Sequence, residues 1–209
     1  MAFATIDVTK GITGTIPVAN GGTGLTSGTS GQLLKFTGST TLASSAITTG
    51  KILQVIMFET TSATATTNAN LQDTALAQNI TPSSTSSKIL IQIQPCMQVY
   101  STNREAGGGY GISREIDNAN NTTVWETKYS YDGIFVDCDT TGANEVRNYP
   151  YVSYLDSPNT TGVCRYKFRI KAYNGDNCRM SENSGKSTMY LYEVAAWLKQ
   201  LLFHQLFIL

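Results

Sequence analysis

The sequence is poor in the residues that carry most metal and redox chemistry. Its 209 residues include one histidine, His204, and four cysteines, Cys96, Cys138, Cys164 and Cys178. No two cysteines form a C-x-x-C pair, whereas a structural zinc site needs four closely placed Cys or His ligands. The spacing therefore argues against a metal site.

A secretory signal is also lacking, because residues 1–7 have neither a basic start nor an apolar run. Disulfides form in oxidising compartments. We therefore expect the four cysteines to be free thiols, which behave as small hydrophobic groups when they are buried.

Charge is scarce as well. Charged residues make up 14% of the chain, against about 25% in a typical soluble domain. The 15 basic and 15 acidic residues balance to a formal net charge of zero, so the overall charge does not favour nucleic acid or an anionic membrane as a partner. No apolar run reaches the ~20 residues that cross a bilayer. A polar, weakly charged surface suits a protein that packs against copies of itself or sits in a large assembly.

The sequence offers only weak candidates for a set of catalytic residues. Asp132, Asp137 and Asp139 cluster in the sequence, and two carboxylates that flank a cleft can hydrolyse a glycoside. The alternative, which we favour, is that these residues end strands and start turns. His204 lies in an apolar tail, away from any G-x-S-x-G elbow. Residues 20–24 lack the glycine spacing and the lysine of nucleotide-binding loops. We therefore expect no enzyme activity and no cofactor.

The composition changes near residue 50. Residues 1–50 hold half of the 18 glycines, and their only charged residues are Asp7, Lys10 and Lys35. A segment with so few large apolar groups cannot build its own core. It can be ordered when its backbone pairs with other chains. We interpret residues 1–50 as an extended arm or stalk.

Residues 51–196 alternate strand-like runs with turn-rich gaps. Residues 164–172 place Cys, Tyr, Phe, Ile and Ala on one face and alternate them with Arg and Lys, which predicts a half-buried strand. Residues 88–94 place three isoleucines on one face in the same way. Residues 51–59 form a continuous apolar run, which is typical of a strand buried on both faces.

Two further strands are expected at residues 123–131 and 187–195. The first would place Trp125, Thr127 and two tyrosines on a common face. About eight short strands with Gly, Asp and Asn in the gaps predict an all-β fold, a β-sandwich of the jelly-roll type.

The C-terminal segment breaks this pattern. Apolar residues recur at helical spacing in residues 194–209 and predict a short amphipathic helix. We expect residues 197–209 to dock on sister subunits or on a neighbouring protein; a membrane-surface helix and an inessential extension are the alternatives. The docking residues would be Trp197, Leu198, Leu201, Leu202 and Leu206.

The strand at residues 164–172 also carries a basic face. Such a face can hold an anionic glycan or phosphate, or it can pair with acidic residues of a neighbouring strand. A glycan-binding role would in addition need exposed aromatics in a cleft, such as Tyr110, Trp125 or Tyr149. The basic candidates are Arg165, Lys167, Arg169 and Lys171.

Two stretches carry a family resemblance. Residues 14–24, GTIPVANGGTG, and the following GQLL at 31–34 resemble a motif of phage tail-fibre and other virion proteins. Residues 80–91, ITPSSTSSKILI, together with YLDSP at 154–158 and residues 188–195, are similar to the C-terminal domain of marine-phage fibre-like proteins.

The resemblance implies a non-enzymatic structural protein of a tailed-phage virion, assembled in the cytoplasm of a bacterial host. It implies a homotrimeric fibre or appendage subunit with a role in host attachment. A capsid decoration or head-fibre protein and a host-glycan-binding module are the alternatives. The expected partners are further copies of the chain, other virion proteins and a host surface glycan, but not nucleic acid.

Overall fold

The computed structural model describes part of the chain in detail. The described residues are 16, 18, 22–25, 27–39, 41–46, 52–102, 105–137 and 144–195. The expected docking helix at 197–209, Cys138, Asp139 and His204 lie outside them, as does most of the glycine-rich stretch at 14–24. The chain divides into two compact units, residues 1–50 and residues 51–209.

The N-terminal unit contains one antiparallel hairpin. It is formed by β1 (Gln32–Gly38) and β2 (Thr41–Ala46). Every side chain of β1 is exposed within the chain, including those of Leu33, Leu34 and Phe36. An isolated two-stranded hairpin is at best marginally stable in water.

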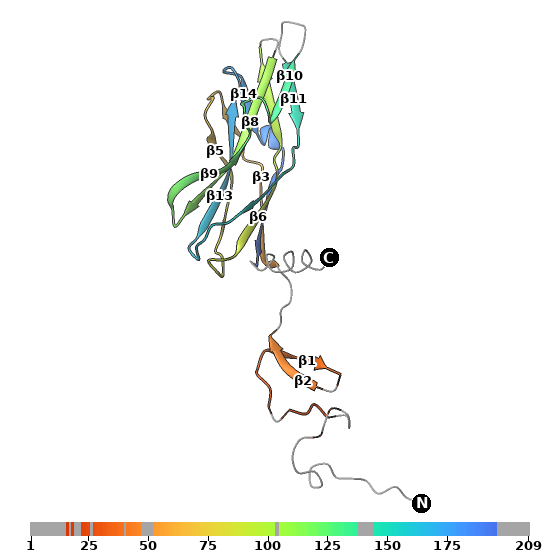
Figure 1. Cartoon of the computed structure of the whole chain (residues 1–209). Helices are drawn as coiled ribbons and strands as arrows, with labels where there is room; N and C mark the ends of the chain where they lie inside the picture. Colours follow the sequence, from red (N-terminus) through yellow and green to blue (C-terminus); the bar gives the residue numbers. More distant parts are fainter. Residues whose placement is uncertain are drawn as a thin grey trace, which may run out of the picture. The chain divides into compact units, whose positions relative to one another are not determined.

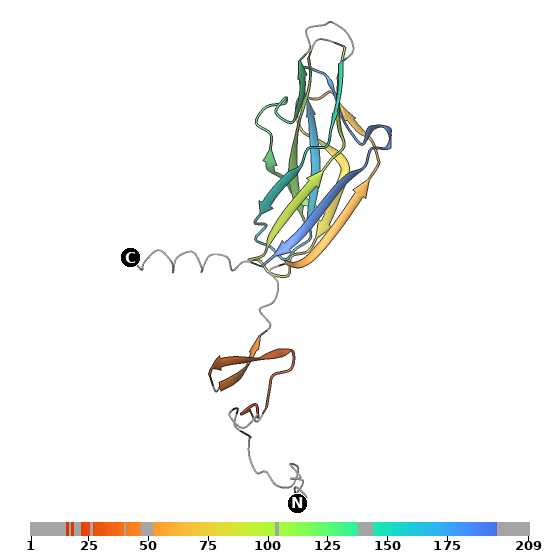
Figure 2. The same ribbon diagram turned by 90° about the vertical axis from the view of Figure 1, so that its right-hand side faces the viewer.

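The larger unit consists of thirteen strands and one short 3₁₀ helix among the described residues (Figures 1 and 2). The elements are β3 (Ile52–Thr60), β4 (Thr64–Thr66), β5 (Gln72–Ile80), β6 (Lys88–Gln94), β7 (Met97–Ser101), β8 (Glu105–Ile116), β9 (Ala119–Glu126), β10 (Ile134–Asp137), β11 (Asn144–Asn148), β12 (Val152–Asp156), β13 (Cys164–Ala172), β14 (Asn177–Met180), the 3₁₀ helix Glu182–Ser184 and β15 (Ser187–Val194).

The strands form two layers. One layer contains two four-stranded sheets, with the strand orders β12-β6-β15-β3 and β11-β7-β14-β4. Each strand of the first sheet is the chain neighbour of the strand at the same place in the second, as β6 is of β7, so the second sheet continues the first. Pro95 and Pro150 stand at two of these junctions, where the missing N–H of proline interrupts a ladder. At the same break the Ser187 hydroxyl accepts a hydrogen bond from the Cys96 N–H at 2.9 Å.

The opposite layer has the order β10-β8-β13-β5, and β9 also pairs with β8. All pairings are antiparallel. The chain crosses between the layers after β4, β5, β7, β10, β12 and β13. This connectivity is that of a jelly roll. The predicted all-β sandwich is therefore confirmed.

The core lies between the layers and follows the period-2 pattern. Ile89, Ile91 and Ile93 of β6 are buried, as expected, and they face Tyr166 and Phe168 of β13 within one cluster. β5 carries a bulge at Thr74, whose hydroxyl donates to the Phe168 carbonyl at 2.7 Å and accepts from the Leu76 N–H at 3.1 Å. The side chain thus satisfies the backbone groups that the bulge would leave unpaired.

Three of the cysteines are core residues. Cys96, Cys164 and Cys178 are buried and free, as expected. Burial raises the pKa of the Cys164 thiol to about 11 and that of Cys178 to about 12. Both therefore stay protonated at neutral pH, and a protonated thiol is a poor nucleophile.

The serine-rich stretch at residues 81–87 is held by one carboxylate. Glu193 of β15 is 1% exposed. It accepts hydrogen bonds from the Ser83 N–H and hydroxyl, both at 2.6 Å, and from the Gln54 amide at 2.8 Å. The motif that suggested the family resemblance thus has a structural role, because it closes the loop between β5 and β6.

A second carboxylate joins the two layers. Asp156 of β12 accepts hydrogen bonds from Arg114 of β8 at 2.5 Å and from the Tyr166 hydroxyl of β13 at 2.6 Å. Burial, with Asp156 as hydrogen-bond acceptor, raises the pKa of the Tyr166 phenol. The aspartate of the YLDSP stretch therefore ties one sheet to the other.

Two strand predictions need correction. The run at residues 51–59 is not buried on both faces, because β3 is an edge strand whose Leu53, Val55 and Met57 are exposed. The strand expected at residues 123–131 ends at Glu126, since the chain turns over residues 128–133. Tyr129 and Tyr131 therefore lie in a loop and not on a strand face with Trp125.

Candidate functional site: two opposite sheet faces

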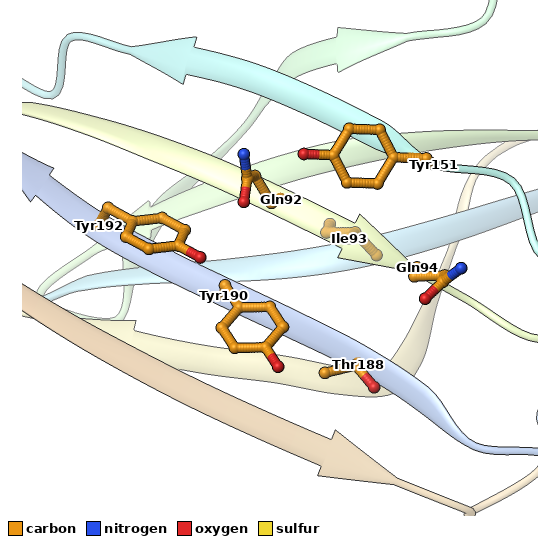
Figure 3. A pocket seen from close by; sticks show the side chains of 7 residues that line it. All are labelled: Gln92, Ile93, Gln94, Tyr151, Thr188, Tyr190 and Tyr192. Atoms are coloured by element: carbon orange, nitrogen blue, oxygen red, sulfur yellow. The ribbon is translucent and has the colours of Figure 1, made fainter.

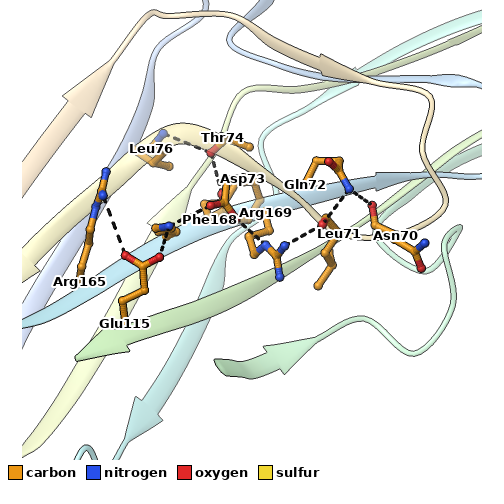
Figure 4. Close-up of polar contacts among 11 residues, drawn as sticks. Asn70, Leu71, Gln72, Asp73, Thr74, Leu76, Glu115, Arg165, Phe168 and Arg169 are labelled. Atoms are coloured by element: carbon orange, nitrogen blue, oxygen red, sulfur yellow. Dashed lines mark hydrogen bonds and ion pairs between the residues drawn. The ribbon is translucent and has the colours of Figure 1, made fainter. Parts of the chain in front are cut away.

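The basic residues of β13 form the outer surface of one layer, which we call the charged face. Lys167 donates to Asp73 at 2.9 Å and also to Glu115. Arg169 lies 2.7 Å from Asp73 and donates to the Leu71 carbonyl at 2.8 Å. Figure 4 shows this network on β5, β8 and β13.

The remaining two basic residues are paired as well. Lys171 contacts Glu126 at 3.1 Å and donates to the Thr127 carbonyl at 3.0 Å. Arg165 lies 3.9 Å from Glu115. All four cations thus have a carboxylate neighbour, which is the ion-pair alternative that the sequence left open.

The pKa values follow from these pairs. Burial lowers the pKa of Lys167, but the hydrogen bonds and charges of Glu115 and Asp73 outweigh it and hold that pKa above its ordinary value. Burial likewise raises the pKa of Asp73, and Lys167 and Arg169 bring it below its usual range. A hollow of about 330 Å³ beside Arg169 and Lys171 is thus lined by cations that already have anionic partners. Binding of an external anion there stays a prediction that the geometry disfavours.

The three aromatic candidates differ in how far their side chains are exposed. Tyr110 is 8% exposed, and its ring lies 5.6 Å from Phe168 and 6.0 Å from Trp125. Tyr110 therefore lacks the exposure that a glycan-binding role would need, because its strand turns the side chain into the core. Trp125 is half-buried against the same core, and Tyr149 is exposed.

The structure shows an exposed aromatic cluster that the sequence did not reveal. Tyr131 stacks on Tyr129 at 5.4 Å and meets Tyr173 edge-on at 5.3 Å. Phe135 of β10 lies 5.8 Å from Tyr173. These rings gather over Gly107, where a Cβ atom would lie about 3 Å from Phe135 and Tyr173. The glycine run at 107–109 was the available signal, since it marks a close approach of other groups.

The outer surface of β12-β6-β15-β3 has the opposite character, and we call it the neutral face. Among its described residues no charged side chain lies between Glu59 and Lys88, which stand at the ends of their strands. Its outward residues are Leu53, Val55, Met57, Leu90, Gln92, Gln94, Tyr151, Ser153, Leu155, Thr188, Tyr190, Tyr192 and Val194.

A shallow hollow of about 160 Å³ lies on the neutral face. Tyr151, Tyr190 and Tyr192 surround it together with the Gln92 and Gln94 amides (Figure 3). The Tyr190 and Tyr192 rings are stacked with centroids 6.2 Å apart. The hollow therefore offers aromatic surface and neutral hydrogen-bonding groups.

Two of the three acidic candidates lie among the described residues, one in a turn and one at the end of a strand. Asp132 accepts a hydrogen bond from the Tyr129 N–H at 2.8 Å within a turn. Asp137 is the last residue of β10, and its backbone lies opposite that of Glu105 on β8. No cluster of three or more Cys, His, Asp or Glu side chains that could hold a metal occurs among the described residues.

Among the residues that the structure describes, no helix is long and apolar enough to cross a bilayer.

The fold and the two faces define a jelly-roll β-sandwich with one charged and one neutral sheet face. No protein-family model matches the chain, and no curated protein matches it. Among solved structures, the VP2 subviral particle of infectious bursal disease virus matches with a TM-score of 0.31 and 11% identity, over 78% of this chain and 42% of that chain.

Two further structures of the same virus give similar values. A T=1 particle derived from it has a TM-score of 0.30 and 10% identity, over 78% of this chain and 40% of that chain. Its Gt strain has a TM-score of 0.26 and 11% identity, over 78% and 42%. The chain thus spans less than half the length of these proteins.

Proposed function

We propose that this chain is a non-enzymatic structural subunit of a virion and that it works as a homotrimer in a fibre-like appendage. The stretches at 14–24, 31–34 and 80–91 support this role through their resemblance to phage fibre proteins. The jelly roll supports it too, because viral capsid domains use this architecture widely. The appendage is a tail fibre with a role in host attachment; a head fibre or a capsid decoration protein is the alternative.

The exposed hairpin β1–β2 carries the proposal. Leu33, Leu34 and Phe36 are 54%, 50% and 65% exposed within one chain. The segment around them has too few apolar groups to cover them. Hairpins of three chains that meet at one axis cover each other's apolar side chains and pair their open edges.

Sedimentation of the full chain at micromolar concentration tests the trimer. We expect a trimer for the native sequence and a shift toward monomer for Phe36→Lys, which places a charge in the covered surface. Phe135→Lys is the matched control, since Phe135 is an exposed phenylalanine of the other unit. A native chain that sediments as a monomer throughout contradicts the proposal.

The virion location has its own test. Mass spectrometry and antibody labelling of purified particles should find the protein in the virion, on the tail for a fibre or on the shell for a decoration protein. Absence from the particles contradicts the structural role. Release of reducing ends from host envelope polysaccharide, abolished by Asp137→Ala or Asp139→Ala, would contradict the non-enzymatic role.

The exposed aromatic cluster favours a second function, binding of a host surface glycan. Aromatic faces stack on the apolar faces of sugar rings, and the cluster presents Tyr129, Tyr131 and Phe135 to solvent. A glycan array should then show binding that Tyr131→Ala abolishes. Val163→Ala, at an exposed apolar residue outside the cluster, should leave the binding unchanged. Retained binding in Tyr131→Ala excludes the cluster as the glycan site.

We also propose that residues 197–209 dock on sister subunits or on a neighbouring virion protein. Burying each large apolar side chain there contributes roughly 1.5–3 kcal/mol. Truncation after Ala196 should weaken the trimer or prevent incorporation into the particle. Normal assembly of the truncated chain, with insertion of the full-length tail into liposomes, would favour the membrane alternative.

A further inference from the structure

We propose that the neutral face is the surface through which the sandwich units of neighbouring copies of this chain contact each other. This inference rests on the proposed self-assembly and names the surface that the sandwich unit contributes to it. The occupant of the face is a second copy of the same chain.

The register of the sheet gives the face a continuous apolar row. Val55 of β3 lies opposite Tyr192 of β15, and Tyr192 lies opposite Leu90 of β6. Leu90 in turn lies opposite Leu155 of β12. One row of outward side chains across all four strands is therefore apolar or aromatic.

The next row changes from apolar to amide and hydroxyl groups. It runs from Met57 through Tyr190 to Gln92 and Ser153. Val55, Met57 and Leu155 are each about half exposed. Large contiguous exposed apolar patches are uncommon on monomeric soluble proteins and mark interaction sites.

The contrast with the charged face shows that the apolar character belongs to one side only. There Lys167, Arg169 and Lys171 form ion pairs over β13 with Asp73 and Glu126, whose side chains are 42% and 47% exposed. That face already presents charged groups to water. The neutral face has no such groups between its two ends, so it is the side of the sandwich that gains most from being covered.

The chemistry of the neutral face fits its own copy. Two identical charged surfaces repel each other, whereas this surface brings no like charges together. The amides of Gln92 and Gln94 carry both donors and acceptors, so each can hydrogen-bond to the same group of another copy. A partner that binds through charge would find nothing here with which to pair.

Covalent connection to the hairpin favours the same occupant. Only residues 47–51 separate β2 from β3 in the chain. When hairpins of several copies associate, this short connection raises the concentration of the attached sandwiches near one another. Three copies that direct one face at a common axis then bury it, and the hollow beside Tyr190 can receive a side chain of a neighbour (Figure 3).

A charge placed on the face tests the inference in the full chain. Val55→Lys should raise the concentration at which the oligomer half dissociates by about tenfold or more, because a lysine must be desolvated in each contact. Val163→Lys is the matched control, since Val163 is a valine exposed on the other side of the sandwich, 40% against 54% for Val55. It should leave that concentration unchanged. Circular dichroism should show that both variants fold.

The outcomes separate this inference from the proposed function. If Phe36→Lys dissociates the oligomer and Val55→Lys does not, the hairpin contact stands and the neutral face is not an interface. If the native chain is a monomer, both the proposed trimer and the contact through the neutral face are overturned.

Photo-crosslinking identifies the occupant. A benzoylphenylalanine at position 190 should crosslink to β3, β6, β12 or β15 of another copy, and mass spectrometry of the linked peptides should show this. A crosslink confined to other surfaces of the chain, or no crosslink within an intact oligomer, overturns the inference. The inference is also overturned if a bound glycan, and not another copy of the chain, covers the neutral face.

Discussion

At the scale of single residues, Glu193 links the stability of the fold to pH. Burial alone would raise its pKa, but hydrogen bonds from Ser83, Ser87 and Gln54 lower it below the ordinary value. A carboxyl group with a depressed pKa in the folded state stabilises the fold above its unfolded pKa of about 4.3. That stabilisation is lost as the pH falls through the folded pKa.

We predict that Glu193→Gln destabilises the sandwich at pH 7. The amide turns an NH₂ group toward donors that need an acceptor, which costs about 1–3 kcal/mol. Chemical denaturation should show a difference from the native chain that shrinks below about pH 4. Glu59→Gln, at a more exposed carboxylate on β3, is the control. A difference that does not depend on pH would contradict the linkage.

Asp156 gives a second prediction, because it joins the sheets through one acceptor. Tyr166→Phe removes the hydroxyl that donates to Asp156 at 2.6 Å. Hydrogen bonds to charged groups contribute about 1.5–3 kcal/mol, so we expect a loss of that order in the free energy of unfolding. Tyr151→Phe, at an exposed tyrosine, should change it little. Equal unfolding midpoints for the two variants would show that the bond contributes nothing.

At the scale of elements, the glycines of β8 allow the two layers to approach. A Cβ atom at Gly108 would lie 2.5 Å from the Cys178 sulfur and 3.0 Å from Val99. Both neighbours are core residues of the opposite layer, so they cannot move freely.

Gly108→Ala should therefore destabilise the fold by about 1–3 kcal/mol through overpacking. Thermal unfolding measures the loss. Gly28→Ala is the control, since a Cβ atom there meets no atom within 4 Å. If the native chain and Gly108→Ala unfold at the same temperature, the layers are looser at this point than the structure shows.

The sequence predicted those strands whose two sides meet different surroundings. In β13 and β6 one side faces the core and the other faces water or a neighbouring charge, so side-chain polarity alternates along the strand. Such strands, together with the turn residues between them, were sufficient to predict the sandwich class.

The neutral face could not be predicted in the same way. The apolar residues of β3 suggested burial on both sides. A sequence does not distinguish an apolar residue that is buried within its own chain from one that is exposed there and that a second chain can cover. The burial of Tyr110 could not be predicted for a related reason. Its neighbours on β8 are glycines, which give no polarity pattern to show which side faces the core. The aromatic cluster joins Tyr129 and Tyr173, and only the fold brings them together.

At the scale of the whole molecule, the two sheet faces predict how assembly responds to salt. Screening shortens the range of charge interactions from ~10 Å at 0.1 M to ~3 Å at 1 M ionic strength. Contacts through the neutral face involve few charges, so the dissociation constant of the native oligomer should change by less than about threefold over that range. Val55→Lys brings like charges together, so salt should tighten its association. Sedimentation equilibrium at both salt concentrations measures this. A native oligomer that weakens strongly with salt would indicate contacts through charged residues such as those of β13, and not through the neutral face.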